Sequence, residues 1–358
     1  MTCYGLRGSA CRRKPAGKES NVYKSCCLGC GPRARGHADA YKHVKKARLE
    51  AVCDANAERL AKFADEFRIP RRYADVREML EKEKPDLLHV VTQPQQRLEF
   101  FQLAEELGVP AVLVEKPLCL DAADFNAIAA FGQTAKTKVI VNHQLRYHPK
   151  TLELLEIVRS GEIGEVRLID GSARYPLAGQ GTHVLNLMLA YAGDHRPTRV
   201  FGQVSGKRFF IPHHPCPDSA VGELVFDSGV HGLLACGENA PVVHDPKVDW
   251  MHKRVAVYGT QGFVHWTMNS WELFTPERGY QRGEKSYAGE DVLGQAAMTD
   301  AIFAWLEDAA RPHFNRLEVS LAESNAVLGL YHSALEHAVV PLPWSPSYCL
   351  LDALRARL

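Results

Sequence analysis

The feature that most restricts the fold is an alternation of two textures between residues 24 and 142. Short apolar runs are followed by longer segments with the apolar spacing of an amphipathic helix. Runs that are apolar throughout suit strands covered on both faces, and strands separated by helices suit a parallel sheet. The predicted strands are 25–28, 48–53, 87–91, 111–114 and 139–141, and the predicted helices are 57–67, 97–107 and 122–135.

A glycine-rich turn, Gly-Cys-Gly-Pro-Arg-Ala at positions 29–34, follows the first predicted strand. Gly29 allows a tight turn, and Gly31 removes a side chain where the backbone must approach a pyrophosphate at the start of a helix. Asp54 ends the second strand, where a carboxylate binds ribose hydroxyls and repels a 2′-phosphate. The pattern predicts a dinucleotide-binding domain for NAD, with NADP as the alternative; the plainer interpretation is a glycine turn beside a capping aspartate.

After about residue 147 the texture changes to strands joined by short glycine turns, which indicate an antiparallel sheet. Two long helical segments close the chain. The predicted divisions are a flexible extension over 1–21, a dinucleotide-binding domain over 22–145, and an α+β domain for substrate binding and oligomerisation over 146–358. The predicted elements of this last part are a helix at 150–159, strand pairs 221–226 with 230–236 and 254–258 with 263–267, and helices at 292–309 and 320–337.

Composition narrows the classes of partner. The formal net charge is +1, from 43 basic and 42 acidic residues, whereas proteins that grip nucleic acid usually carry a basic excess. No apolar stretch reaches the roughly 18 residues that a transmembrane helix needs. Ten cysteines, several in apolar runs, favour a reducing compartment. We therefore expect a cytoplasmic protein with a small-molecule substrate and neither a nucleic-acid nor a membrane partner.

Two short patterns have the look of metal sites. Cys27 and Cys30 have a zinc-like spacing, but no second pair completes a site, so small core residues are the preferred interpretation. His213 and His214 are adjacent, which makes it hard for both to face one ion, and a loop at the substrate mouth is preferred. We expect no metal.

The strand that ends at Val114 runs into Glu115-Lys116-Pro117, so a lysine stands at the edge of the sheet where ligands bind. With the glycine turn, Asp54 and Gly181-x-His183, this motif makes the chain resemble the Gfo/Idh/MocA oxidoreductase family over roughly residues 24–342. Further matching motifs are Arg146-Tyr147-x-Pro149, Gly161-x-Ile163-Gly164, Tyr258-Gly259-Thr260-x-Gly262 and Leu342-Pro343. The resemblance implies an α/β fold: an N-terminal Rossmann doubly wound parallel sheet, then a C-terminal α+β domain with a large, mostly antiparallel sheet.

The resemblance also implies the catalytic pair Lys116 and His183. Oxidation of an alcohol releases a proton, and a histidine or a desolvated lysine is suited to take it near neutral pH. The chain departs from the family at Gly179, where many members carry an aspartate, and at Asn186. The predicted substrate contacts are Gln144, Arg146, Tyr175 and Asn186.

The predicted function is an NAD(P)-dependent oxidoreductase that moves a hydride between nicotinamide and a secondary hydroxyl of a sugar, glycoside or cyclitol. The alternatives are an NAD-recycling glycosidase or lyase and a non-catalytic NAD-binding regulator. The resemblance implies a homodimer or homotetramer. The predicted cofactor-binding residues are Gly29, Cys30, Gly31, Arg33, Ala34, Asp54, Thr92, Pro94, Glu115 and Lys116.

Overall fold

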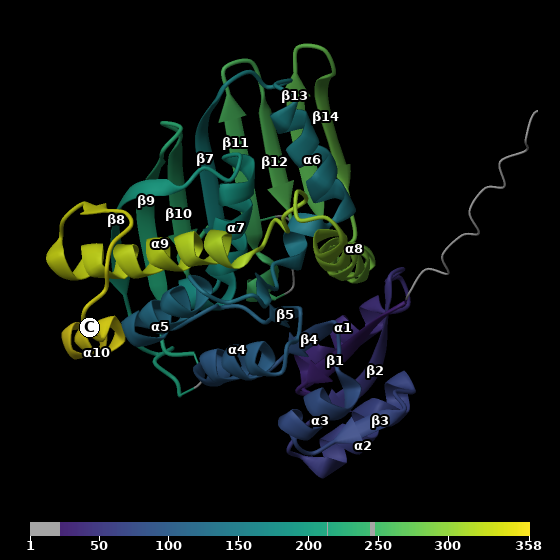
Figure 1. Cartoon of the computed structure of the whole chain (residues 1–358). Helices are drawn as coiled ribbons and strands as arrows, with labels where there is room; N and C mark the ends of the chain where they lie inside the picture. Colours follow the sequence, from purple (N-terminus) through teal and green to yellow (C-terminus); the bar gives the residue numbers. More distant parts are fainter. Residues whose placement is uncertain (1–21, 213, 244–247) are drawn as a thin grey trace, which may run out of the picture.

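The computed structural model describes residues 22–212, 214–243 and 248–358. The extension predicted over residues 1–21 lies outside the described residues, as does His213. Two sheets organise the rest of the chain. Figure 1 shows a small sheet built from the first part of the chain and a large sheet above it, with helices between and around them.

The first sheet has six parallel strands in the order β3-β2-β1-β4-β5-β6. The strand order reverses between β1 and β4, which places a crevice outside the carboxyl ends of these two strands. The elements are β1 (Tyr23–Leu28), α1 (Pro32–Ala40), β2 (Ala47–Cys53), α2 (Ala57–Phe67), β3 (Arg71–Tyr73), α3 (Val76–Glu83), β4 (Leu87–Val90), η1 (Pro94–Gln96), α4 (Arg97–Glu106), β5 (Ala111–Val114), α5 (Ala122–Gly132) and β6 (Lys138–Val141).

Helices cover both faces of this sheet, which explains why its strands are apolar at consecutive positions. Alternate strand residues pack in opposite directions. One set, which includes Leu88 and Val112, packs with α3, α4 and α5. The other set packs with α1 and α2 and, beside Leu87 and Ala111, with α8 (Tyr287–Glu307). A helix from the far end of the chain therefore completes the core of the first sheet.

The second sheet has nine strands in the order β14-β13-β12-β11-β7-β10-β9-β8-β15. All its pairings are antiparallel except that of β10 with β7. The elements are η2 (Gln144–Tyr147), α6 (Pro149–Arg159), β7 (Val166–Ala173), the π-helical turn η3 (Leu177–Gly181), α7 (Thr182–Tyr191), β8 (Pro197–Ser205), β9 (Ser219–Phe226), β10 (His231–Cys236), η4 (Asp249–Met251), β11 (Lys253–Gly259), β12 (Phe263–Thr267), β13 (Ser270–Thr275), β14 (Gly279–Glu284), α8, α9 (Leu317–Glu336), β15 (Val340–Pro341) and α10 (Leu350–Arg357).

Helices α6, α7 and α9 lie across one face of this second sheet (Figure 1). Glycines let them approach: a Cβ on Gly171 would meet Met188 and Val184 of α7 within 2.7 Å. The strand register places Phe201, Leu233 and Phe274 on the opposite face, where these three side chains are exposed.

The fold class is confirmed: an α/β parallel sheet with doubly wound strand order, followed by an α+β part with a large, mostly antiparallel sheet. The predicted hairpins are present as β9–β10 and β11–β12. Among the described residues, no helix has the length and apolar composition that crossing a bilayer requires.

Candidate functional site

A cleft of about 750 Å³ lies at the carboxyl edge of the first sheet and is closed on its other side by α7, α8 and β11. The crevice at the strand-order reversal thus meets side chains from the second sheet. The predicted residues that line it are Gly29, Gly31, Arg33, Asp54, Thr92, Glu115, Lys116, Gln144 and His183.

The glycine turn has the geometry that a phosphate-binding loop requires. Gly29 has φ +94°, and a Cβ there would lie 2.4 Å from the Val91 carbonyl oxygen, so only glycine fits the turn. A Cβ on Gly31 would meet nothing within 4 Å and would project into open space beside the cleft. Helix α1 begins at Pro32 without a side-chain cap, so its N-terminal end is available to an anion.

Asp54 is organised by the turn and by the next helix. Its carboxylate accepts hydrogen bonds from the backbone N–H groups of Cys30 and Asn56, each at 2.8 Å. It also accepts two from the Arg59 guanidinium, at 2.6 and 2.8 Å. Burial alone would raise the pKa of Asp54, but these donors hold it below its ordinary value. An anionic carboxylate therefore stands where the ribose of a dinucleotide is expected.

Glu115 anchors a buried polar cluster beneath the cofactor loop. It accepts hydrogen bonds from Arg33 at 2.8 Å and from Asn142 at 2.5 Å, and its Oε1 lies 2.8 Å from His37 Nε2. Although burial opposes ionisation, Arg33, His37 and Lys116 hold the pKa of Glu115 well below its usual range. The cluster fixes the strand end that carries Lys116.

Lys116 points across the cleft to the second half of the molecule. Its ammonium group donates a hydrogen bond to the Gly179 carbonyl oxygen at 2.6 Å, and the Lys116–Pro117 peptide bond is cis. Burial, opposed by Glu115 and assisted by Arg33 and Arg97, lowers the pKa of Lys116 to about 8. Lys116 is thus poised to give up a proton near neutral pH.

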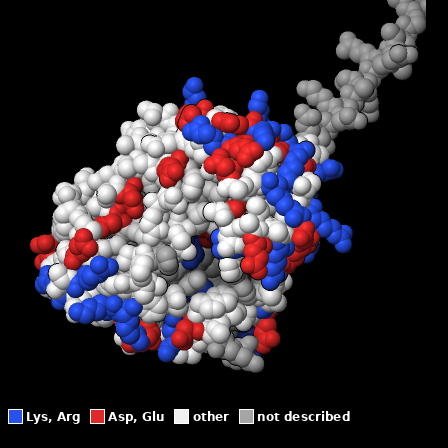
Figure 2. Space-filling model, turned by 90° about the horizontal axis from the view of Figure 1, so that it is seen from below, with Lys and Arg blue, Asp and Glu red and all other residues white. Residues whose placement is uncertain are grey.

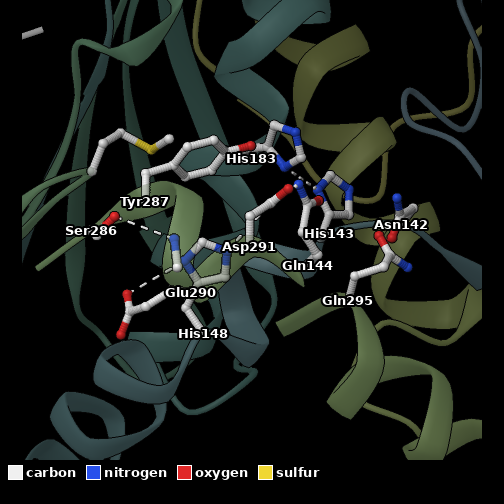
Figure 3. A network of polar contacts seen from close by, with 12 residues as sticks. Asn142, His143, Gln144, His148, His183, Ser286, Tyr287, Glu290, Asp291 and Gln295 are labelled. Atoms are coloured by element: carbon white, nitrogen blue, oxygen red, sulfur yellow. Dashed lines mark hydrogen bonds and ion pairs between the residues drawn. The ribbon is translucent and has the colours of Figure 1, made fainter. Parts of the chain in front are cut away.

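His183, in the first turn of α7, faces the cleft. Behind it lies a buried series of polar groups, His143 and then Glu323. Its Nδ1 lies 3.3 Å from His143 Nδ1, and His143 Nε2 lies at ion-pair distance, 3.2 Å, from Glu323 Oε1 on α9. Figure 3 shows the two imidazole rings pointing toward one another. Burial and the nearby Lys116 keep the pKa of His183 well below its ordinary value, so the ring is neutral.

The acid at the end of this series of polar groups, Glu323, was not predicted from the sequence. Asn186 donates a hydrogen bond to Glu323 at 3.2 Å, so the asparagine holds the carboxylate that lies behind His143. Glu323 is only 4% exposed. It comes from a helix that begins 134 residues after His183, so no local spacing could have revealed the contact.

Part of the cleft wall comes from Trp250 and from three residues that were not predicted from the sequence, Gln96, Lys253 and Tyr287. Tyr287 opens α8, and its ring meets Trp250 edge-on with centroids 5.6 Å apart. Figure 3 places Tyr287 and Asp291 on the same helix, close to Gln144. Gln144 donates a hydrogen bond to Asp291 at 3.0 Å.

Three predicted substrate residues do not line the cleft. Arg146 is fully buried and pairs with Asp194 at 2.6 Å, because the short turn η2 directs it away from Gln144 and the cleft. Asn186 is fully buried against Glu323. Tyr175 packs edge-on against Phe209 and does not line the cleft.

Three predicted cofactor residues likewise do not line the cleft. Cys30 and Ala34 are buried, and the N–H of Cys30 is engaged by Asp54. Pro94 is buried in η1, whereas its neighbours Thr92, Gln93 and Gln96 line the cleft. In this loop the sequence indicated the correct segment and Thr92, but not Gln93 and Gln96.

In the described part of the chain, no three potential metal ligands converge on one point; His213 lies outside the described residues. Cys27 and Cys30 are buried thiols. Burial raises the pKa of Cys30 to about 12, so it stays a neutral thiol. His214 lines the cleft, in agreement with the predicted loop at the substrate mouth.

Comparisons with known proteins agree with this geometry. Residues 24–143 match the model of the Gfo/Idh/MocA family, described as an oxidoreductase family with an NAD-binding Rossmann fold. D-apiose dehydrogenase from Paraburkholderia graminis is 32% identical over 60% of this chain and 60% of its own length. The match to the D-apiose dehydrogenase of Rhizobium rhizogenes is 29% identical and covers 40% of this chain and 41% of that protein. This chain therefore spans less than two thirds of either relative.

Solved structures match over nearly their whole length. An oxidoreductase from Agrobacterium radiobacter, in complex with NAD+, L-tartaric acid and magnesium, has a TM-score of 0.77 at 19% identity, covering 90% of this chain and 98% of that one. Levoglucosan dehydrogenase in complex with NADH and levoglucosan has a TM-score of 0.75 at 16% identity, over 90% and 100%. Residues 24–143 thus match the NAD-binding Rossmann domain of the Gfo/Idh/MocA oxidoreductase family, and the fold of the whole chain is that of these solved oxidoreductases.

Proposed function

We propose that this protein is an NAD-dependent dehydrogenase that moves a hydride between the nicotinamide ring and a secondary hydroxyl of a sugar or cyclitol. One observation carries the proposal: Lys116 and His183, from the two halves of the molecule, line the same cleft as the cofactor turn. Relatives named as apiose, inositol and UDP-N-acetylglucosamine dehydrogenases support the substrate class.

The residues present fit the cofactor. Gly29 and Gly31 keep the turn open for a pyrophosphate, and Asp54 presents an anionic carboxylate to ribose hydroxyls. Bound NAD would supply the hydride acceptor. Because the Asp54 carboxylate repels a 2′-phosphate, we propose NAD rather than NADP as the preferred cofactor.

Lys116 is the proposed base. Its lowered pKa leaves a useful neutral fraction near pH 7, and a neutral amine can take the hydroxyl proton as the hydride leaves the same carbon. Its contact with the Gly179 carbonyl oxygen aims the nitrogen across the cleft. The hydrogen bond that holds the ammonium therefore also sets its direction toward a substrate.

His183 is proposed to position the substrate. The Glu323 carboxylate, 3.2 Å from His143 Nε2 but without an aligned hydrogen bond, electrostatically favours the His143 tautomer with hydrogen on Nε2, and His143 Nδ1 can then accept the Nδ1–H of His183. The remaining ring nitrogen of His183, Nε2, then carries a lone pair that can accept a hydrogen bond from a neighbouring hydroxyl of the substrate, while the proton of the reacting hydroxyl goes to Lys116. Glu323 thereby supplies from α9 the orienting acid that Gly179 lacks.

The exposed face of the large sheet is the proposed interface between subunits. Phe201, Val221, Leu233 and Phe274 lie on the face opposite α7 and α9, and each is at least 38% exposed. An exposed apolar face on one side of a sheet suits a self-complementary contact. We propose a homodimer or a larger homo-oligomer built on this face.

The test is to follow NADH absorbance with NAD or NADP against neutral sugars, glycosides, cyclitols and sugar acids, with Lys116→Met as the control. Steady NADH formation that the variant loses supports the dehydrogenase. A flat trace accompanied by glycoside cleavage would show a cofactor-recycling enzyme instead. Turnover that Lys116→Met retains would refute the assigned base.

A further inference from the structure

A second buried lysine faces the cleft, and the dehydrogenase chemistry does not use it. Lys253 begins β11, is 1% exposed and lines the cleft. The next residues on the same side of its strand, Val255 and Val257, are fully buried core positions. An ammonium group at such a position costs free energy unless a partner compensates it.

The partners that Lys253 has in the protein are weak ones. Its ammonium donates a hydrogen bond to the Trp250 carbonyl oxygen and lies 5.0 Å from the centroid of the Trp250 ring. Among the described residues, no carboxylate lies within ion-pair distance of it. Burial lowers the pKa of Lys253 to about 7, and Lys116 contributes in the same direction.

The acidic groups that the structure describes around the cleft are already engaged by other residues. Asp291, the carboxylate that most favours a charged Lys253, accepts a hydrogen bond from Gln144 at 3.0 Å and lies 3.5 Å from His148. Glu115 is held by Arg33 and its neighbours. The inner part of the cleft therefore presents two lysines and the neutral His183 to a ligand.

We propose that the substrate carries a carboxylate, which Lys253 binds while a hydroxyl is oxidised at Lys116. The substrate class is then a sugar acid, such as an aldonate or a uronate, rather than a neutral sugar. This inference rests on the proposed dehydrogenase function. It assigns to Lys253 the role of a specificity-determining residue.

The charge count favours a carboxylate over a phosphate. Lys116 must be neutral to act as a base, whereas an anion bound beside Lys253 favours the charged form of that lysine, so a bound ligand pairs with one cation. One positive charge balances a monoanion, whereas a phosphate monoester near pH 7 carries between one and two negative charges. Trp250 and Tyr287, both lining the cleft, add flat apolar surfaces beside the lysine against which the carbon face of a sugar ring packs.

The experiment measures binding and turnover separately, on the full-length protein. Calorimetry in the presence of NADH compares D-glucuronate with D-glucose, D-galacturonate with D-galactose, and D-glucuronate with its methyl ester and with D-glucose 6-phosphate. Each acid is expected to bind about 10- to 100-fold more tightly than its neutral partner, the range for a hydrogen bond to a charged group. Equal affinity within each pair, or tighter binding of the phosphate, would overturn the proposal without any variant.

Variants assign the effect to Lys253. Lys253→Gln is expected to bring each acid and its neutral partner within threefold of one another, while the melting temperature with NADH confirms a folded protein. Lys150→Gln is the matched control, because Lys150 also lies over a tryptophan ring, 4.3 Å from the centroid of Trp271, but outside the cleft. A preference for acids that survives Lys253→Gln would refute the assignment.

The two proposals fail in different ways. If neutral sugars reduce NAD and acids neither bind nor react, the dehydrogenase function is supported and the carboxylate site is refuted. If acids bind in a Lys253-dependent way but none of the compounds reduces NAD, the carboxylate site is supported and the dehydrogenase function is refuted.

Discussion

The pH dependence of alcohol oxidation is expected to follow the ionisation of Lys116. The pKa of this lysine is lowered from 10.5 to about 8, chiefly by burial. A base with a pKa of 8 is about one-tenth neutral at pH 7, whereas an ordinary lysine would be neutral in about one molecule in three thousand. Burial of Lys116 therefore increases the active fraction at pH 7 by about 300-fold.

Because the neutral amine is the active form, the turnover rate falls as the pH drops below the pKa of Lys116 and reaches its maximum above that pKa. We expect kcat, measured by NADH absorbance at saturating NAD and substrate, to rise roughly tenfold between pH 7 and pH 9 and then to level off. Lys116→Arg, which keeps a permanent positive charge, and Lys116→Met are each expected to lower kcat by about 10²–10⁴-fold and to abolish this rise.

Two results would refute this assignment. A rise in kcat centred above about pH 9.5 would show that burial does not set the ionisation of Lys116. A rise near pH 8 that persists in Lys116→Met would assign the titrating group to another residue. Bound NAD in the variants, measured by calorimetry, separates loss of the base from loss of the cofactor site.

Three further predictions concern other parts of the molecule. Glu323→Gln should lower kcat about tenfold with little change in the Kd for NAD, because the tautomers of His143 and His183 are no longer fixed. Glu318→Gln, an exposed change on the same helix, should match wild type. Equal kinetics of the two variants would contradict the role of Glu323 in orienting the histidines. Asp54→Ala should raise the Kd for NAD at least tenfold and narrow the gap to NADP, whereas Asp65→Ala on the outer side of α2 should do neither; an unchanged cofactor preference would argue against the ribose contact. Leu233→Lys should convert the oligomer into monomers by light scattering at micromolar concentration, and an unaltered mass would place the interface elsewhere.

The parallel sheet was predictable because local sequence patterns mark its strands and helices. Runs such as 111–114 are apolar at every position, and Asp75 and Asp121 cap the following helices as their side chains suggest, accepting from the N–H groups of Glu78 and Ala122. The glycine turn was equally predictable, because at Gly29 a side chain would collide with the Val91 carbonyl oxygen and only glycine fits.

The far wall of the cleft was not predictable, because it depends on contacts between distant segments. Glu323 reaches His143 from 180 residues further along the chain. Lys253 stands just before the predicted strand 254–258, so its place in a buried row went unnoticed. Gln144 lines the cleft and Arg146 does not, because residues two apart in a short 3₁₀ turn point in different directions, and the sequence does not say which one meets the cleft.

The π-helical turn at Gly179 couples this position to residue 175. A Cβ on Gly179 would lie 2.8 Å from the Tyr175 ring, which is itself packed against Phe209. An aspartate at position 179 therefore requires a smaller residue at position 175 or a displaced Tyr175 ring. An acid can be introduced beside Lys116 from this turn only by changing the two positions together, so a single substitution at position 179 tests the packing of the turn as well as the chemistry of the site.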